Sequence, residues 1–339
     1  MTKILIIYTG GTIGMVNDSE TGSLIPFDFG QIRQNVPELA RLNYDLEVHS
    51  FDPILDSSNM DPTAWVELAR IIESRYDQFD GFVILHGSDT MAFTASALSF
   101  MLENLSKPVV LTGSQLPIGE IRTDAKENLI TALEIAATRK HHAAMVPEVS
   151  IYFDYQLFRG NRSIKYNSEK FEAFQSPNYP LLGEAGVSLS FYKNYIQHQP
   201  KEPFKVHYNL DPNIGVLKLY PGISKNAVDA ITQSAVAAIV LETFGSGNTT
   251  TAAWFTERLQ AAVDSGKIIV DISQCQGGSV QLGKYETSKR LEQMGVLSGY
   301  DMTFEATVTK LMFLMGQGLS REEIMQGMGR SLRGEMTVN

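Results

Sequence analysis

Short apolar runs alternate along this chain with amphipathic segments of helical spacing. In the first half the strand-like runs cover residues 3–8, 45–51, 81–86, 107–112 and 148–153. Several of them are apolar at consecutive positions, which is typical of strands buried on both faces of a sheet. The alternation predicts right-handed crossovers and a largely parallel, doubly wound α/β sheet. We therefore expect functional side chains at the carboxyl ends of these strands.

Three helices are predicted between the strand-like runs. The clearest is "DPTAWVELARIIESRY", where Asp61 suits the N-cap, Pro62 suits the first helical position, and apolar residues recur at helical spacing. The other two are expected over 91–105 and 124–138.

A polar stretch interrupts the alternation in the second half. Residues 191–213 contain three prolines and no sustained period, which predicts a linker. The alternation then resumes, with strand-like runs at 214–220, 237–243 and 267–273. We predict two domains, an N-terminal α/β domain over 1–190 and a smaller C-terminal α/β domain over 214–339.

Composition narrows the classes of partner and compartment. The chain has 28 Lys plus Arg against 38 Asp plus Glu, a net charge of −10, which argues against a nucleic-acid binder and favours a small-molecule partner. The single cysteine, Cys275, suits a reducing cytoplasm. The N-terminal apolar run is shorter than a signal-peptide core, and no apolar run approaches the ~18 residues of a membrane span. We expect a cytoplasmic protein with no membrane partner.

Hydroxyl side chains follow four of the early strand-like runs. In a parallel sheet these loops share one edge, so the hydroxyls are expected to converge there with Asp89. Such a polar cluster is a site hypothesis. The residues are Thr9, Thr12, Ser57, Ser58, Ser88, Thr90 and Ser114.

The loop "TGGTIGM" after the first run lacks the spacing of a phosphate-binding loop, because no Lys follows its glycines. A plain tight turn is one interpretation. The other makes Thr12 a nucleophile, since glycines allow backbone and substrate to approach closely, and backbone N–H groups could form an oxyanion hole.

Two further segments offer proton-handling groups. In "HGSDT", Ser88 and Asp89 could belong to a catalytic or binding site, or they could cap the next helix. His86 does not make a Ser-His-Asp hydrolase, because the chain has no G-x-S-x-G elbow. In "RGNRSIK", Lys165 could reach the Asp–Ser pair, although a solvated loop also explains the three cations. No histidine spacing suits a metal, so we expect no catalytic metal.

Taken together, "YTGGTIGM", "DSSNM", "HGSDTMAFTASALSFMLENLSKPVVLTGSQ", "RGNRSIK" and "FGSGN" resemble the bacterial-type L-asparaginases, closest to the cytoplasmic type I group. The resemblance covers nearly the whole chain. It implies hydrolysis of L-asparagine to L-aspartate and ammonia without a cofactor. It also implies a flavodoxin-like N-terminal domain, a smaller α/β C-terminal domain, and homodimers or homotetramers.

The resemblance assigns roles residue by residue. Thr12 matches the nucleophile that forms an acyl-enzyme, and Ser88, Asp89 and Lys165 match a second catalytic triad that handles protons. Ser88 stands where the family usually has threonine. Asp89 also matches the carboxylate that binds the substrate α-ammonium. The remaining matches are Asp56, Ser57 and Ser58 for the α-carboxylate, and Gly11 and Gly87 for the oxyanion or loop support.

Three positions depart from the family pattern. Leu24 lies near the place of a tyrosine that is thought to help activate the nucleophile, so the base for Thr12 is not assigned. Ser279 replaces a glutamate of the secreted enzymes. Glu242 replaces an arginine that binds a regulatory asparagine in some type I members, so that second site is not expected here. Asn248 is expected at a contact between subunits.

Two alternative functions stay open at this point. One is a mixed asparaginase-glutaminase, because one methylene is worth only about 1 to 3 kcal/mol of discrimination in a pocket. The other is a non-catalytic amino-acid sensor on the same fold. Thr12, Asp89 and Lys165 argue against a sensor, since a binding protein has no need of a nucleophile.

Overall fold

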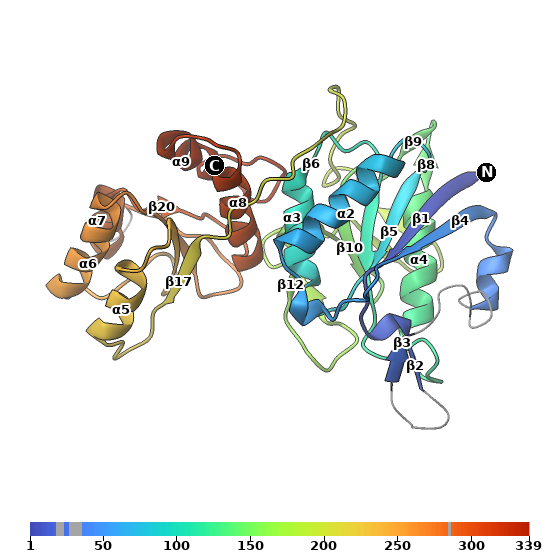
Figure 1. The fold of residues 1–339 in the computed structure, drawn as a ribbon, viewed down its shortest axis with the longest axis horizontal. Helices are drawn as coiled ribbons and strands as arrows, with labels where there is room; N and C mark the ends of the chain where they lie inside the picture. Colours follow the sequence, from blue (N-terminus) through green and yellow to red (C-terminus); the bar gives the residue numbers. More distant parts are fainter. Residues whose placement is uncertain (18–23, 27–35, 284–285, 339) are drawn as a thin grey trace. The chain divides into compact units, whose positions relative to one another are not determined.

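The computed structural model describes residues 1–17, 24–26, 36–283 and 286–338. The chain forms two compact units, Met1–Tyr208 and Asn209–Asn339. Figure 1 shows both as layers of helices and strands.

The first unit is built on an eight-stranded sheet in the order β15-β14-β11-β10-β7-β5-β1-β4. Five neighbouring strands are parallel, namely β4 (Tyr44–Ser50), β1 (Thr2–Tyr8), β5 (Gly81–Leu85), β7 (Val109–Thr112) and β10 (Val149–Phe153). Numbered along the chain they run 2-1-3-4-5, the flavodoxin-like order. The predicted doubly wound sheet is confirmed. An antiparallel edge extends it through β11 (Gln156–Arg159), β14 (Gly183–Ala185) and β15 (Leu189–Phe191).

Helices cover both faces of this sheet (Figure 1). Helix α2 (Pro62–Arg75) begins as predicted, with the Asp61 carboxylate accepting N–H bonds from Thr63 and Ala64. Helix α3 (Met91–Met101) packs beside α2, and α4 (Ala125–Ala137) lies against β1, β5, β7 and β10. Helix α3 is shorter than the predicted 91–105, because residues 102–103 form strand β6 (Leu102–Glu103) and pair with β16 (Lys205–Val206).

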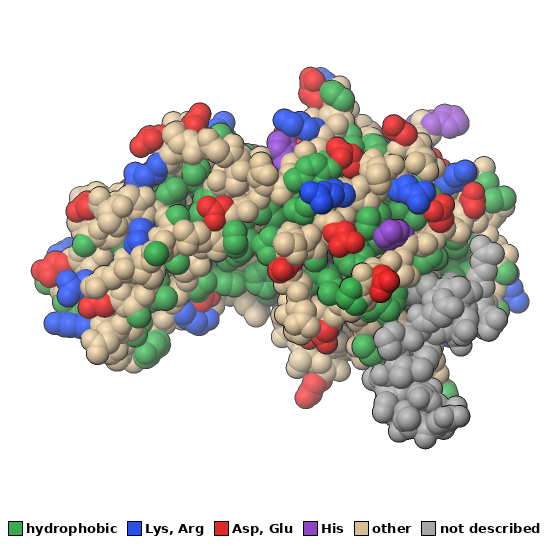
Figure 2. Space-filling view, in the orientation of Figure 1, with side chains coloured by type: hydrophobic (Ala, Val, Ile, Leu, Met, Phe, Trp, Pro, Cys, Tyr) green, Lys and Arg blue, Asp and Glu red, His purple; other side chains and the backbone are tan. Residues whose placement is uncertain are grey.

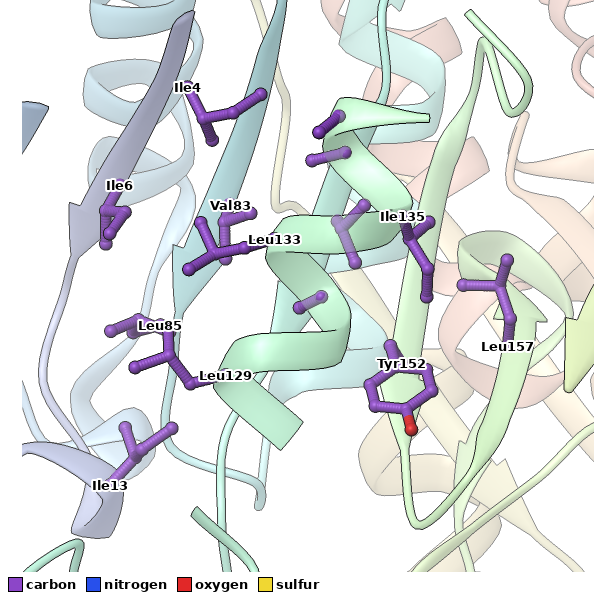
Figure 3. Close-up of a cluster of buried hydrophobic side chains, with 14 of the residues drawn as sticks. Ile4, Ile6, Ile13, Val83, Leu85, Leu129, Leu133, Ile135, Tyr152 and Leu157 are labelled. Carbon is purple, nitrogen blue, oxygen red and sulfur yellow. The ribbon is translucent and has the colours of Figure 1, made fainter. Parts of the chain in front are cut away.

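The core between the sheet and α4 consists of large aliphatic side chains. Strands β1 and β5 send Ile4, Ile6, Val83 and Leu85 toward Leu129 and Leu133 of α4, as Figure 3 shows. All six are fully buried. Burying each such side chain stabilises the fold by roughly 1.5 to 3 kcal/mol. This core holds the strand ends, and therefore the loops that follow them, in fixed positions.

Three two-stranded pairs complete the first unit. They are β2 (Met15–Asn17) with β3 (Leu24–Pro26), β8 (Arg139–Lys140) with β9 (Ala143–Ala144), and β12 (Ile164–Lys165) with β13 (Phe174–Gln175).

The polar segment that follows β15 is bonded to the first unit. The Arg159 guanidinium donates to the Tyr195 carbonyl at 2.8 Å, and the Gln197 N–H donates to the Glu148 carboxylate at 2.7 Å. In the structure the division between units falls between Tyr208 and Asn209. Buried polar partners far away in the sequence hold this proline-containing stretch, although its composition is that of a linker.

The second unit is a four-stranded parallel sheet in chain order, β17 (Ile214–Lys218), β18 (Ala238–Thr243), β19 (Ile268–Ser273) and β20 (Leu297–Ser298). The predicted smaller α/β domain is thereby confirmed. Ser224 caps the first helix of this unit by accepting the Ala227 N–H. The helices are α5 (Lys225–Thr232), α6 (Ala253–Asp264), α7 (Glu286–Met294), α8 (Phe304–Gly316) and α9 (Arg321–Met328).

Charged side chains of both signs are interspersed on the surface. Figure 2 shows this mixing over the described residues of the face drawn. On that face the acidic and basic side chains are not gathered into separate patches. Among the described residues, no helix has the length and apolar character that crossing a membrane requires.

Candidate active site

The loops that follow β1 and β5 leave the sheet at its topological switch point. The chain moves from β1 to β4 on one side and to β5 on the other, so the order of strands reverses at β1. Open α/β sheets bind ligands in the crevice at the carboxyl ends of the strands at this point. The loops "TGGTIG" and "HGSDT" both start there.

Glycines bring these two loops into backbone contact. Gly11 has φ +89° and ψ 170°, a conformation that is essentially restricted to glycine. A Cβ atom on Gly11 would lie 2.5 Å from the Gly87 N and Cα atoms. Gly10 has φ +136°, and a Cβ there would lie 2.0 Å from the Leu55 carbonyl oxygen. The glycine pair is therefore more than a plain turn, because it packs one strand-end loop against two others.

A third loop, after β4, joins the same contact. A Cβ on Gly87 would lie 2.6 Å from the Ser57 hydroxyl oxygen, and the Thr90 hydroxyl donates to the Ser57 carbonyl at 2.6 Å. Ser57 opens the short 3-10 helix η4 (Ser57–Asn59) and is 4 % exposed. The three loops thus meet around Gly11, Gly87 and Ser57.

Asp56 and Ser58 form an exposed hydrogen-bonded pair beside this contact. The Asp56 carboxylate accepts the Ser58 N–H at 2.8 Å and the Ser58 hydroxyl at 2.7 Å. These two bonds lower the pKa of Asp56. Asp56 is therefore held as an anion that fixes the direction of the Ser58 side chain.

Thr12 begins the 3-10 helix η1 (Thr12–Gly14) and is half-buried. The Tyr8 hydroxyl donates to the Gly14 carbonyl at 3.0 Å, and burial raises the pKa of Tyr8 to about 12. Tyr8 is therefore a protonated brace for the loop and not a base for Thr12. The backbone of Leu24 lies in β3 opposite Asn17, and the adjacent residues 18–23 and 27–35 lie outside the described residues.

Lys165 connects Ser88 and Asp89, as predicted. Its ammonium nitrogen lies 2.8 Å from the Ser88 hydroxyl oxygen and 2.5 Å from an Asp89 carboxylate oxygen. Strand β12 carries Lys165, whose side chain is 14 % exposed, whereas that of Asp89 is 68 % exposed. The lysine is thus largely buried, while the Asp89 carboxylate is exposed to solvent, where a ligand can meet it.

The alternative role of Ser88 and Asp89 as helix caps is not what the structure shows. Thr90 is the N-cap residue of α3, and its side chain makes no capping bond. Its hydroxyl donates instead to Ser57. Ser88 and Asp89 lie before the helix and contact Lys165.

His86 is a buried residue that supports the fold of its loop. The ring is completely buried, with Nδ1 2.7 Å from the Gly87 carbonyl oxygen and Nε2 2.8 Å from the Thr94 hydroxyl. Burial lowers the pKa of His86 to about 4, so the ring is neutral and Nδ1–H donates to Gly87. This bond holds the "HGSDT" loop. Across the described residues, no three His, Cys, Asp or Glu side chains gather as metal ligands.

The two arginines of "RGNRSIK" are buried, which contradicts the solvated-loop alternative for this segment. Arg159 forms an ion pair of 2.7 Å with Glu148, and both side chains are at most 6 % exposed. Arg162 is 2 % exposed and stacks over Tyr179 at 5.0 Å from the ring centre. These contacts fix the segment that carries Lys165.

Two of the predicted hydroxyls turn away from the cluster. Thr9 donates to the Leu85 carbonyl at 3.0 Å, and Ser114 donates to the Leu116 carbonyl at 2.6 Å. The sequence prediction omitted Gln115, whose side-chain oxygen lies 3.4 Å from the Ser88 hydroxyl. Its position directly after Ser114, in a strand-end loop, was the available signal.

The second unit holds the other predicted positions. Glu242 lies 3.4 Å from Lys218 across neighbouring strands. Asn248 closes the "FGSGN" turn, donating its N–H to the Phe244 carbonyl at 2.8 Å. Ser279 is half-buried in the segment after β19.

The three loops offer a carboxylate for a cationic group, hydrogen-bond donors for an anionic group, and the Thr12 hydroxyl as a nucleophile for acyl transfer. An exposed carboxylate suits a cationic amine, and hydroxyl and N–H donors suit a carboxylate. A threonine on a glycine loop, next to a loop with a lysine-bound serine, suits acyl transfer.

Known protein families match both units. The model described as "Asparaginase, N-terminal" matches residues 3–197, and that of the "Glutaminase/Asparaginase C-terminal domain" matches residues 213–328. L-asparaginase 1 of Escherichia coli K12 is 44 % identical over 99 % of this chain and 98 % of its own. A crystal structure of L-asparaginase I from Vibrio cholerae is 43 % identical, with a TM-score of 0.91 over 99 % of both chains. A 60 kDa lysophospholipase of Mus musculus is 40 % identical over 99 % of this chain but 63 % of its own. The chain therefore belongs to the asparaginase family.

Proposed function

We propose that this protein hydrolyses L-asparagine to L-aspartate and ammonia. The observation that carries the proposal is the meeting of three loops at the switch point of the sheet, around Gly11, Gly87 and Ser57. These loops present Thr12, the Asp56–Ser58 pair, and Ser88 with Asp89, which Lys165 of β12 contacts. Membership of the asparaginase family supports the choice of substrate.

In the proposed complex the loops bind the two charged groups of the amino acid. Asp89 accepts the α-ammonium, which its 68 % exposed side chain can meet. Ser57 and Ser58 face the α-carboxylate, and the Ser58 hydroxyl, which donates to Asp56 in the free protein, turns to donate to the substrate. The side-chain amide is then placed toward Thr12, with backbone N–H groups near Gly11 and Gly87 as donors to the oxyanion.

The first half of the reaction forms an acyl-enzyme. The Thr12 hydroxyl oxygen bonds to the amide carbon while its proton passes to solvent. The carbon–nitrogen bond then breaks, and the leaving nitrogen takes the Ser88 proton as Lys165 replaces it on Ser88. Ammonia leaves, and Lys165 is left neutral.

The second half reverses this proton path. Water bonds to the acyl carbon and gives one proton to Ser88, whose own proton returns to Lys165. The bond to Thr12 breaks, and the Thr12 oxygen takes a proton from solvent. Aspartic acid is released and ionises, so that every group of the site regains its starting state.

We further propose a homodimer or homotetramer in the cytoplasm, with Asn248 at a subunit contact. The exposed free thiol of Cys275 supports a reducing compartment. Light scattering after size-exclusion chromatography measures the oligomer, and a monomer at micromolar concentration would contradict the assembly.

Initial rates of ammonia release test the activity. We expect a much higher kcat/KM for L-asparagine than for L-glutamine. Release of fatty acid from lysophosphatidylcholine serves as a third assay, because one relative is described as a lysophospholipase. Purified, folded protein that is inactive on both amides would refute the proposal, with or without activity on the lipid.

A further inference from the structure

Gln115 is fixed at its backbone beside the catalytic cluster. Its N–H donates to the Asp124 carboxylate at 2.9 Å, and the neighbouring Leu116 N–H donates to the same group at 3.2 Å. The Asn128 amide bonds both Asp124 and the Gly113 carbonyl, at 3.3 and 2.9 Å. The loop after β7 is therefore anchored on both sides of Gln115.

The side-chain amide of Gln115 has one favourable orientation. Its Nε2 group donates to the Lys170 carbonyl at 2.9 Å, and a flipped amide would place two oxygens against each other there. The amide oxygen consequently faces the Ser88 hydroxyl at 3.4 Å. An amide oxygen only accepts hydrogen bonds, so Ser88 is the donor in this contact.

The same reasoning fixes the second contact of Ser88. The Lys165 ammonium has donors and no acceptor, so the Ser88 oxygen accepts the 2.8 Å bond from Lys165. The proton of Ser88 thus points at Gln115 while its oxygen points at Lys165. Within the described contacts, this is the one arrangement in which each group has a suitable partner.

We propose that Gln115 is a positioning residue for the amide hydrolysis proposed above, on which this inference rests. Its amide oxygen holds the Ser88 side chain in the rotamer that keeps the hydroxyl oxygen on Lys165. Serine needs such a partner, because its χ1 angle has three staggered positions, whereas a β-branched threonine is restricted by its own methyl group.

The length of the contact suits a temporary role. At 3.4 Å the bond from Ser88 to Gln115 is long and therefore weak. Ser88 can exchange it for a bond to the leaving nitrogen without a large loss. Gln115 does not touch the reacting atoms in this scheme, so its effect is on the population of the productive rotamer.

The first test compares two substitutions of similar length. Gln115→Met removes the acceptor and has room, because Gln115 borders an open pocket with Arg122 and Phe171. We expect kcat for L-asparagine to fall by about 3- to 10-fold, the loss of one neutral hydrogen bond, with KM little changed. Gln115→Glu keeps the acceptor oxygen that faces Ser88 but sets its other oxygen against the Lys170 carbonyl. It is therefore expected to lower Tm while retaining more kcat than Gln115→Met. Gln260→Met is the matched control, because Gln260 bonds only Asp264 on α6 among the described contacts and is expected to leave kcat unchanged.

The second test uses Ser88→Thr, in which the side chain of residue 88 restricts its own χ1 rotamer. In the Ser88→Thr background, Gln115→Met is expected to cost less than 2-fold in kcat, since threonine needs no external partner to hold its rotamer. Equal losses in the two backgrounds would overturn the proposal, as would an unchanged kcat for Gln115→Met. A loss shared equally by Gln115→Met and Gln115→Glu would also overturn it, even if Ser88→Thr does not fold.

Failure of this inference is distinguishable from failure of the proposed function. Wild-type protein without ammonia release from L-asparagine refutes the function and removes the basis of the inference. Active wild-type protein with any of the three overturning results for Gln115 refutes the inference alone. Melting temperatures of all variants distinguish the loss of rotamer control at Ser88 from a general loosening of the 166–172 loop. Such loosening would lower Tm and would not be reversed by Ser88→Thr.

Discussion

Replacing Gly11 by alanine tests whether the three loops are packed as tightly as the structure indicates. The backbone conformation of Gly11, φ +89° with ψ 170°, costs an alanine about 1 to 3 kcal/mol. The new Cβ would lie 2.5 Å from Gly87 backbone atoms, which cannot rotate away. Overpacking of this kind costs a further ~1 to 3 kcal/mol. We expect Gly11→Ala to lose about 2 to 6 kcal/mol of stability.

The assay is thermal unfolding combined with initial rates of ammonia release. A loss of that size lowers Tm by roughly 4 to 24 °C in a domain of this length. Catalysis is expected to fall by at least about 10²-fold, because the displaced loop carries Thr12. The control is Gly222→Ala, where φ is +86° but no atom lies within 4 Å of the new Cβ. It is expected to lose only ~1 to 2 kcal/mol and no activity. A Gly11→Ala protein with wild-type Tm and rate would refute the packing argument.

Three further experiments test the charged groups. Lys165→Met is expected to lower kcat by about 10²- to 10⁴-fold with little change in Tm, since its partner Asp89 is 68 % exposed; a large drop in Tm would assign Lys165 a structural role instead. Burial raises the pKa of Asp271 to about 7, so the folded protein keeps a proton that the unfolded chain releases above its ordinary pKa of about 3.9. Urea unfolding is therefore expected to show stability falling as pH rises from about 4 to 7, by up to about 1.4 kcal/mol per pH unit, and Asp271→Asn is expected to flatten the profile; an unchanged slope would contradict this. The Lys310–Glu335 pair, 2.6 Å apart with both side chains 0 % exposed, is expected to lose about 3 to 5 kcal/mol in Lys310→Met and to regain most of it in Lys310→Met with Glu335→Leu; equal melting temperatures for the single and double variants would argue against a buried-charge penalty.

Local pattern was sufficient to predict the parallel strands and the start of α2. Strands buried on both faces are continuous apolar runs, and Asp61 with Pro62 marks a helix start through bonds made within one turn. The end of α3 was missed for the opposite reason. Leu102 and Glu103 both have good helix propensity and would continue the helix, but they pair with residues about a hundred positions later in the chain. The antiparallel edge strands β11, β14 and β15 were also missed, because each is only three or four residues long, although β10–β11 and β14–β15 are local hairpins.

The candidate site was predictable in its residue types but not in its contacts. Hydroxyl residues after successive strands correctly indicated that the site lies at the carboxyl ends of the strands. The sequence did not show that Gly11 and Gly87 pack together, because that depends on the twist and order of the strands. It also left Arg159 and Arg162 looking like surface cations, since Glu148 and Tyr179, which bury them, lie elsewhere in the sequence.

The most direct test of the proposed chemistry is the rate of ammonia release by Thr12→Ala. We expect a loss of at least about 10³-fold in kcat, because no other hydroxyl is proposed to attack the amide. Binding of L-aspartate, measured by calorimetry on the same protein, is expected to persist, since Asp89 and Ser58 are intact. A Thr12→Ala protein that releases ammonia near the wild-type rate would contradict Thr12 as the nucleophile.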